Sequence, residues 1–163
     1  MIGHAADVLT RLLDFSQPAD AVLSTYFREH RTLGGRERGF FAETCYTVLR
    51  HKRQLEKLVQ PAKSPRWLIL AALLRYDGVA QRQLAEVVSA AEKDWLLEFK
   101  SRPEPEFSLA DQADLPDWLT ERLLTQFSAS ELLELARGLN QSAPLDLRVN
   151  SLKATREEVL AQL

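Results

Sequence analysis

The chain has 163 residues, of which 45% are hydrophobic and 27% are charged, and its formal net charge is −2. This composition excludes an intrinsically disordered chain and fits one globular domain, or one domain with part of a second. A single cysteine, Cys45, excludes an internal disulfide framework. Since no signal peptide is visible and no apolar run is long enough to span a bilayer, we expect a cytoplasmic protein without membrane association.

The first sixty residues have the apolar periodicity of amphipathic helices. The spacing predicts a helix over 5–13, and Pro18 suits the first turn of a second helix, which ends before a glycine-rich connection. A third helix is predicted to begin near Arg36. Its apolar pattern pauses over 50–54 and resumes at Leu55, which leaves open either one long helix or two helices that meet at a bend.

A central, buried helix is predicted next. Ser64 and Pro65 suit the cap and the first position of a helix, residues 66–76 are apolar nearly all round, and Asp77-Gly78 ends the pattern. Further apolar residues predict a fifth helix, which either continues through Trp95 or is followed by a short sixth one. The residues of this stretch are Leu84, Val87, Val88, Ala91, Trp95, Leu96 and Phe99.

The character of the chain changes after residue 100. Residues 101–114 contain two prolines and several acidic residues without periodicity, and predict a linker. Two short helices are expected after it, one over 116–127 and one beginning at the capping box of Ser128 and Glu131.

The last twenty residues read as the start of a new unit. Residues 145–150 alternate apolar and polar side chains, as a strand does, and Thr155 with Glu158 forms a capping box for a helix of about two turns. A lone strand has no partner for its backbone groups. We therefore expect residues 145–163 to pack poorly or to be mobile, and to belong to a domain whose remainder follows Leu163.

Charge is distributed unevenly along the chain. Residues 28–66 carry ten Lys or Arg against four Glu, a net charge of +6, whereas residues 85–134 carry four Lys or Arg against twelve Asp or Glu, a net charge of −8. This asymmetry indicates a polyanionic partner for the basic part. The alternative is a solvated basic face that pairs in part with the acidic residues.

Two stretches together resemble one enzyme family. Residues 33–59 resemble the arginine-rich helix of NusB-like domains, with matching residue types at Arg38, Phe41, Glu43, Tyr46, Val48, Leu49 and Arg50. Residues 115–163 resemble the segment that opens the methyltransferase part of RsmB/Sun-type RNA cytosine-C5 methyltransferases. The matching residues there are Pro116, Trp118, Leu119, Asn140, Leu147, Arg148 and Asn150.

The resemblance implies an all-α chain that ends in an incomplete α/β unit. An abbreviated NusB-like helical bundle would occupy 1–100, a short helical linker 101–114, and the incomplete start of an α/β methyltransferase domain 115–163. The implied function is to bind and position RNA, foremost ribosomal RNA, for a catalytic domain attached in cis that uses S-adenosylmethionine. The chain itself is expected to bind no cofactor and to be inactive alone.

Phosphate binding requires long cationic side chains that converge on a backbone. The candidates for RNA contact are Arg28, Arg31, Arg36, Arg38, Arg50, Lys52, Arg53 and Lys57. Aromatic residues in the same region, Tyr26, Phe40 and Tyr46, have the helical spacing of core residues rather than of base-stacking residues.

The alternative function is a helical protein–protein interaction module without direct RNA binding. A self-sufficient enzyme is disfavoured by the residues present. Cys45 lies in the apolar stripe of a helix, and the three histidines have no partner at metal-ligand spacing. Gly34 and Gly35 lie outside any strand–turn–helix unit of the kind that binds a methyl-donor cofactor.

Overall fold

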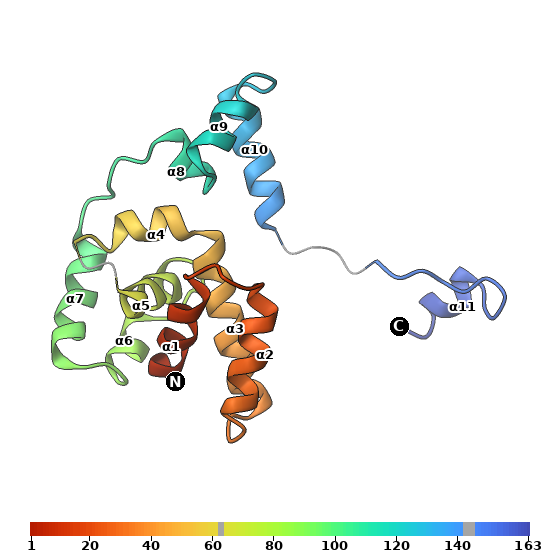
Figure 1. Ribbon diagram of the computed structural model, residues 1–163, viewed down its shortest axis with the longest axis horizontal. Coiled ribbons are helices and arrows are strands. Elements are labelled where there is room, and N and C mark those ends of the chain that lie inside the picture. Colours follow the sequence, from red (N-terminus) through yellow and green to blue (C-terminus); the bar gives the residue numbers. More distant parts are fainter. Residues whose placement is uncertain (62–63, 142–145) are drawn as a thin grey trace.

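A computed structural model describes residues 1–61, 64–141 and 146–163, and within these ranges all regular secondary structure is helical (Figure 1). The helices are α1 (Ile2–Leu12), α2 (Ala19–Glu29), α3 (Gly35–Arg50), α4 (Lys52–Leu58), α5 (Pro65–Arg75), α6 (Gln81–Ala85), α7 (Ala90–Ser101), α8 (Leu109–Ala113), α9 (Asp117–Leu123), α10 (Ala129–Asn140) and α11 (Arg156–Leu160). None of these described helices is long and apolar enough to cross a membrane.

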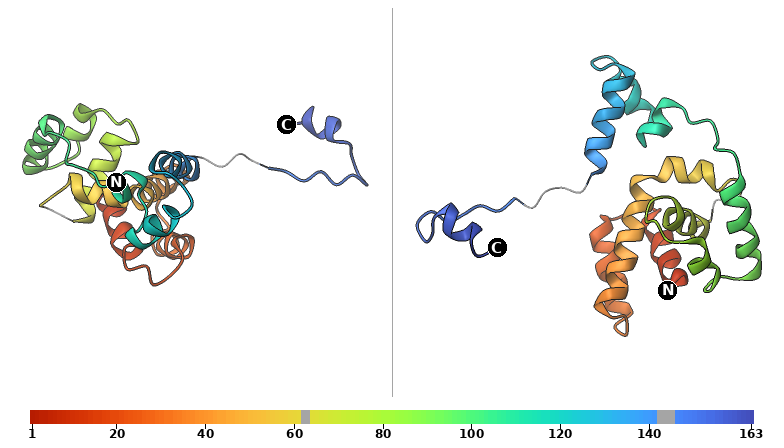
Figure 2. Two further views of the ribbon diagram at one scale, coloured as in Figure 1. Left: turned by 90° about the horizontal axis from the view of Figure 1, so that it is seen from above. Right: turned by 180° about the vertical axis from the view of Figure 1, so that it is seen from behind.

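Helix α5 lies at the centre of the bundle that α1–α7 form. Its residues Leu68–Leu73 are all buried, as the all-round apolar pattern predicts. Helices α1, α3 and α4 pack against it, and α2 packs against α1. Figure 2 shows α7 along one side of this bundle and α2 with α3 along the other. The prediction of a buried central helix is confirmed.

The open question about residues 50–54 is answered by a bend at His51. Helix α3 ends at Arg50 and α4 begins at Lys52, with φ −110° and ψ 26° at His51 between them. The bend turns Leu55 and Val59 of the α4 segment into the same core as α3, where both are fully buried.

The predicted helix through Val87 and Ala91 is wrong. Helix α6 ends at Ala85, Val87 is exposed, and a new helix begins at Ala90. The physical reason is a capping box: Ser89 Oγ accepts a hydrogen bond from the backbone N–H of Glu92, and the Glu92 carboxylate accepts one from the backbone N–H of Ser89. The cap stops α6 and α7 from merging.

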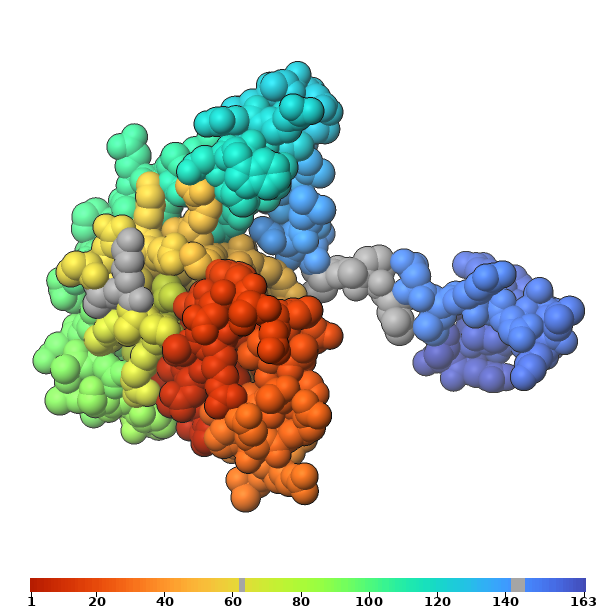
Figure 3. Space-filling view, in the orientation of Figure 1, coloured from red at the N-terminus to blue at the C-terminus, as the bar shows by residue number. Residues whose placement is uncertain are grey.

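Helices α8, α9 and α10 form a smaller unit that lies against α4 (Figure 3). Ala113, Leu132 and Ala136 are its buried core. Residues 109–113 of the segment expected to be a linker form α8, which starts at a capping box of Ser108 and Asp111. The capping box predicted at Ser128 is confirmed and starts α10.

The strand predicted over 145–150 is not found where the structure describes it. Leu145 lies outside the described residues, and 146–150 are not part of a strand. No second strand exists among the described residues, so their backbone groups have no partner with which to form a ladder. The capping box of Thr155 is confirmed, and α11, which buries none of its residues, confirms the expected poor packing.

Candidate nucleic-acid interface

The eight basic residues predicted to contact RNA fall into three places. Four lie where α2 ends and α3 begins, Arg50 lies at the far end of α3, and the other three lie on α4. Helix α3 has 16 residues, and at roughly 1.5 Å per residue its two ends are about 24 Å apart. The structure therefore does not bring all eight side chains to one site.

The four residues at the turn between α2 and α3 form what we call the arginine corner, namely Arg28, Arg31, Arg36 and Arg38. Arg28 donates to Thr25 Oγ1 at 3.0 Å, and Arg38 Nε donates to the backbone oxygen of Leu33 at 3.0 Å. Within the described part of the chain, none of the four makes an ion pair with an acidic residue. Their positive charge is therefore not neutralised by ion pairs with the residues that the structure describes.

The acidic residues of the same region are engaged elsewhere. Glu37 accepts a hydrogen bond from the backbone N–H of Gly34 at 2.9 Å, which completes the start of α3. Glu29 pairs with Arg11 of α1 at 2.7 Å. The arginine corner thus combines several cations with carboxylates that are already satisfied, which is the arrangement a phosphate backbone requires.

The cations of α4 have a different environment, because acidic residues of α8 and α9 neutralise them. Arg53 Nη2 lies 3.0 Å from Asp111 Oδ1 and 2.8 Å from Asp117 Oδ1, and Lys57 Nζ lies 2.5 Å from Asp111 Oδ2. On the same helix, Lys52 pairs with Glu56 at 2.8 Å. Arg53 and Lys57 therefore join the bundle to α8 and α9 rather than presenting free charge.

The Asp111 carboxylate at this junction is nearly buried. Burial by itself raises its pKa, but hydrogen bonds from Lys57, Ser108 and Arg53 outweigh burial, so the pKa of Asp111 lies well below its usual value. Burial lowers the pKa of Arg53, but its hydrogen bonds to Asp117 and Asp111 raise that pKa by more. The net shift is upward, so the charged form of Arg53 is favoured as well. Both groups stay charged at neutral pH.

Asp114 forms a second contact of the same junction. Its carboxylate accepts from His51 Nδ1 at 3.0 Å, from the Gln54 backbone N–H at 3.2 Å and from Gln54 Nε2 at 2.7 Å. The His51 ring stacks on Tyr76 with centroids 3.9 Å apart, and the Tyr76 hydroxyl donates to Gln54 Oε1. Burial, followed by the nearby Asp114 charge, raises the pKa of Tyr76 to about 12.

One feature of the sequence indicates a helix at this junction, and the linker prediction does not account for it. Ser108 and Asp111 have the spacing of a capping box, which predicts a helix start inside the presumed linker. Nothing in the local sequence indicates that Asp111 and Asp114 reach residues 51–57. That contact depends on how the chain returns to α4.

The other side chains weighed in the sequence take structural places. Tyr26 is buried in the core, Phe40 and Tyr46 pack against it, and Cys45 is fully buried. Burial raises the pKa of the Cys45 thiol to about 12, so a thiolate is not available there. These observations confirm the core interpretation of the four residues.

The described residues contain no group of three or more side chains arranged to hold a metal ion. Gly34 precedes α3 and Gly35 is its first residue, so neither stands between a strand and a helix. Gly34 and Gly35 thus do not form a strand-to-helix turn of the kind expected for S-adenosylmethionine.

Comparison with known proteins gives a match to the C-terminal third of the chain. Residues 115–163 match the family described as Methyltr_RsmF/B-like, ferredoxin-like domain. A stretch of 56 residues, 34% of the chain, is 41% identical to the probable ribosomal RNA small subunit methyltransferase B of a Synechocystis species. The match spans 13% of that relative's length. No solved structure matches the chain.

The match agrees with the resemblance drawn from Pro116, Trp118 and the residues around Arg148. The family model covers the residues of α9, α10 and α11. Residues 115–163 are thus similar to RsmB/RsmF-like methyltransferases, and the chain shows distant homology to the probable ribosomal RNA small subunit methyltransferase B.

Proposed function

We propose that this chain is the RNA-binding, substrate-positioning N-terminal region of a longer S-adenosylmethionine-dependent ribosomal RNA cytosine-C5 methyltransferase. The observation that carries the proposal is the RsmF/B-like match over 115–163 beside a bundle whose arginine corner is free of acidic partners. The catalytic domain would be attached in cis and would hold the cofactor. Methyl transfer would therefore require residues other than these 163.

The helical bundle of α1–α7 is the proposed NusB-like domain. Its arginine-rich helix, α3, begins within the arginine corner, and its apolar stripe faces α1 and α5. This arrangement leaves Arg31 and Arg36 exposed at one end of the bundle. Long cationic side chains at such a place suit the backbone of a structured RNA, with arginine preferred for two-pronged contact to phosphate.

The junction between α4 and α8 restricts the proposed RNA surface to part of the predicted set. Arg53 and Lys57 are paired with the buried carboxylate of Asp111 in α8, and Arg53 also with the exposed carboxylate of Asp117 in α9, and a phosphate would have to displace these. We propose that the arginine corner makes the main RNA contact. The α4 cations would hold the RsmF/B-like region in a fixed place relative to that corner.

The test compares two variants with the same change of charge. In the first, Arg28, Arg31 and Arg36 are replaced by Gln; in the second, Arg82, Lys93 and Arg137, exposed on other helices, are replaced by Gln. Binding of a ribosomal RNA hairpin is measured by fluorescence anisotropy at several salt concentrations. We expect the corner variant to bind at least about tenfold more weakly and with a shallower salt dependence, because phosphate contacts are lost.

The control variant should bind nearly as the unmodified chain does. Equal losses in both variants would show that only net charge matters, and the arginine corner would not be the interface. An affinity that does not change with salt would contradict the proposed phosphate contact altogether.

A specific observation favours a protein contact as a second function of α9 and α10. Trp118 and Leu139 are each 68% exposed, and Leu124 of the same small unit is exposed too. A large exposed indole is common at interfaces. We propose that this face packs on the catalytic domain in cis, as the family match over 115–163 supports. If the RNA test fails, these exposed apolar residues favour the protein-contact function instead.

A further inference from the structure

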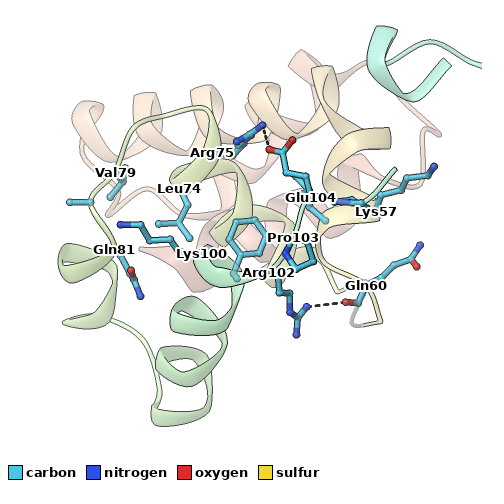
Figure 4. A pocket seen from close by; sticks show the side chains of 14 residues that line it. Lys57, Gln60, Leu74, Arg75, Val79, Gln81, Lys100, Arg102, Pro103 and Glu104 are labelled. Carbon is cyan, nitrogen blue, oxygen red and sulfur yellow. Dashed lines mark hydrogen bonds and ion pairs between the residues drawn. The ribbon is translucent and has the colours of Figure 1, made fainter. Parts of the chain in front are cut away.

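A groove on the opposite side of the bundle from the arginine corner is not explained by the proposed function. It lies between the end of α5, the start of α6, the end of α7 and the extended residues 102–105 (Figure 4). Its volume is about 490 Å³. Small-molecule sites commonly have volumes of roughly 300–1,000 Å³. The groove has the size of a site for one small organic molecule.

The apolar part of the groove contains an aromatic ring at the end of a stack. Phe99 stacks on Trp95 with ring centroids 4.7 Å apart, Trp67 lies tilted against Trp95 with centroids 4.6 Å apart, and Phe99 is the member that lines the groove. Leu74 and Val79 line it beside Phe99. A planar ligand placed here would extend the existing stack, which favours an aromatic ring system over an aliphatic chain.

The rim of the groove is cationic. Lys57, Arg75, Lys100 and Arg102 line it, together with Glu104 as the single carboxylate. Glu104 pairs with Arg75 at 2.5 Å, and within the described residues Lys100 has no acidic partner. Arg75 has five N–H donors, so its pair with Glu104 leaves others for a ligand. An anionic group would be accommodated beside Lys100.

We infer that this groove binds a nucleoside monophosphate, with the base against Phe99 and the phosphate at Lys100. The apolar floor and the unpaired ammonium group both have a counterpart in such a molecule, whereas a purely apolar ligand would leave Lys100 without a partner. The site is separate from the arginine corner, so its occupancy does not depend on the proposed RNA contact.

Titration of the whole chain with adenosine monophosphate tests the inference, with backbone amide shifts in a nitrogen-15 NMR spectrum as the measurement. We expect saturable shifts at residues 74–81 and 99–105. Adenosine, which has the base without the phosphate, should bind at least about tenfold more weakly because it lacks the charge-assisted hydrogen bonds.

Two variants and one control locate the site. Lys100→Gln should weaken binding of adenosine monophosphate about fivefold or more, since it removes the unpaired cation, and Phe99→Leu should weaken binding of both ligands by removing the stack. Lys93→Gln, an exposed position of the same helix outside the groove, should leave binding unchanged.

Three results would overturn the inference. The first is the absence of saturable shifts up to about 5 mM adenosine monophosphate, because a dissociation constant above that concentration would be too weak for a specific site. The second is equal binding of adenosine monophosphate and adenosine. The third is an equal loss of affinity in Lys93→Gln and Lys100→Gln. Each leaves the RNA test untouched, because the arginine-corner variants do not alter the groove.

Discussion

Two nearly buried carboxylates position the segment that leads into the RsmF/B-like region on the bundle. Asp111 lies in the short helix α8 and Asp114 directly follows it, and both side chains are nearly buried against residues 51–57. A buried carboxylate without partners is strongly unfavourable, but each of these accepts several hydrogen bonds from α4 or its start. The two residues therefore fix the position of α8 through polar contacts rather than through a large apolar interface.

Asp114→Asn tests this at the residue scale. The replacement keeps the size of the side chain, and Asn tolerates the positive φ of 53° found there. It substitutes an amide for a charged acceptor that His51 and Gln54 surround. We expect the free energy of unfolding to fall by about 1–3 kcal/mol in denaturant titrations.

Asp117→Asn is the matched control, because Asp117 pairs with Arg53 of the same junction but its side chain is 72% exposed. An exposed ion pair contributes less than about 1 kcal/mol, so this variant should lose little stability. Equal losses in the two variants would mean that the buried position of Asp114 is not what matters.

Capping boxes define the helices at the scale of the element. Those at Ser89, Ser108, Ser128 and Thr155 each start a helix at the position where the cap side chain accepts the N–H three residues later. The capping boxes at Ser128 and Thr155 were expected from the sequence. Those at Ser89 and Ser108 were not, because the prediction there relied on apolar periodicity. A cap satisfies orphan backbone donors locally, so it outweighs a weak apolar pattern that would continue the preceding helix.

Ser89→Ala measures this contribution. The variant loses the side-chain acceptor for the Glu92 N–H and the hydroxyl that donates to the Glu92 carboxylate. We expect destabilisation of about 1 kcal/mol in thermal or denaturant unfolding. Ser101→Ala, near the exposed end of the same helix, should change stability by less than about 0.5 kcal/mol. A Ser89 variant as stable as the Ser101 variant would contradict the role of the cap.

At the scale of the whole molecule, two ion pairs connect segments that are distant in sequence. Arg66 of α5 pairs with Glu92 of α7, and the Arg53–Asp111 pair joins α4 to α8. The bond from Arg66 is the main cause that lowers the pKa of Glu92 from its usual 4.5 to about 2. Because the folded state binds these protons more weakly than the unfolded state, both carboxylates stabilise the fold at neutral pH.

Stability should therefore decline in acid. A carboxylate with a lowered pKa contributes fully above its unfolded value, and the contribution is lost as pH falls from about 4.5 toward 2. We expect the free energy of unfolding of the unmodified chain to drop steeply over this range in urea titrations. The double variant Glu92→Gln with Asp111→Asn should be less stable at pH 7 and lose less on acidification. A double variant with an unchanged acid profile would contradict the assignment.

A feature could be predicted from the sequence when the residues that determine it lie close together along the chain. The buried α5, the caps at Ser128 and Thr155 and the end of α5 before Gly78, whose φ is +67°, could be predicted because each depends on neighbours within a few residues. The eight basic residues could be named as candidates but not sorted, because the residues that neutralise Arg53 and Lys57 lie more than fifty positions away.

The sequence by itself determined that the chain is mostly helical, that its central helix is buried, and that residues 115–163 are RsmB/RsmF-like, since composition, periodicity and motif are properties of the order of residues. Only the tertiary structure decided which cations remain free. The return of α8 to α4 places Asp111 against Arg53 and Lys57, and the same folding leaves Arg31 and Arg36 exposed at the other end of the bundle. The sequence determines which residues are charged, but which of these charges are neutralised depends on distances in space.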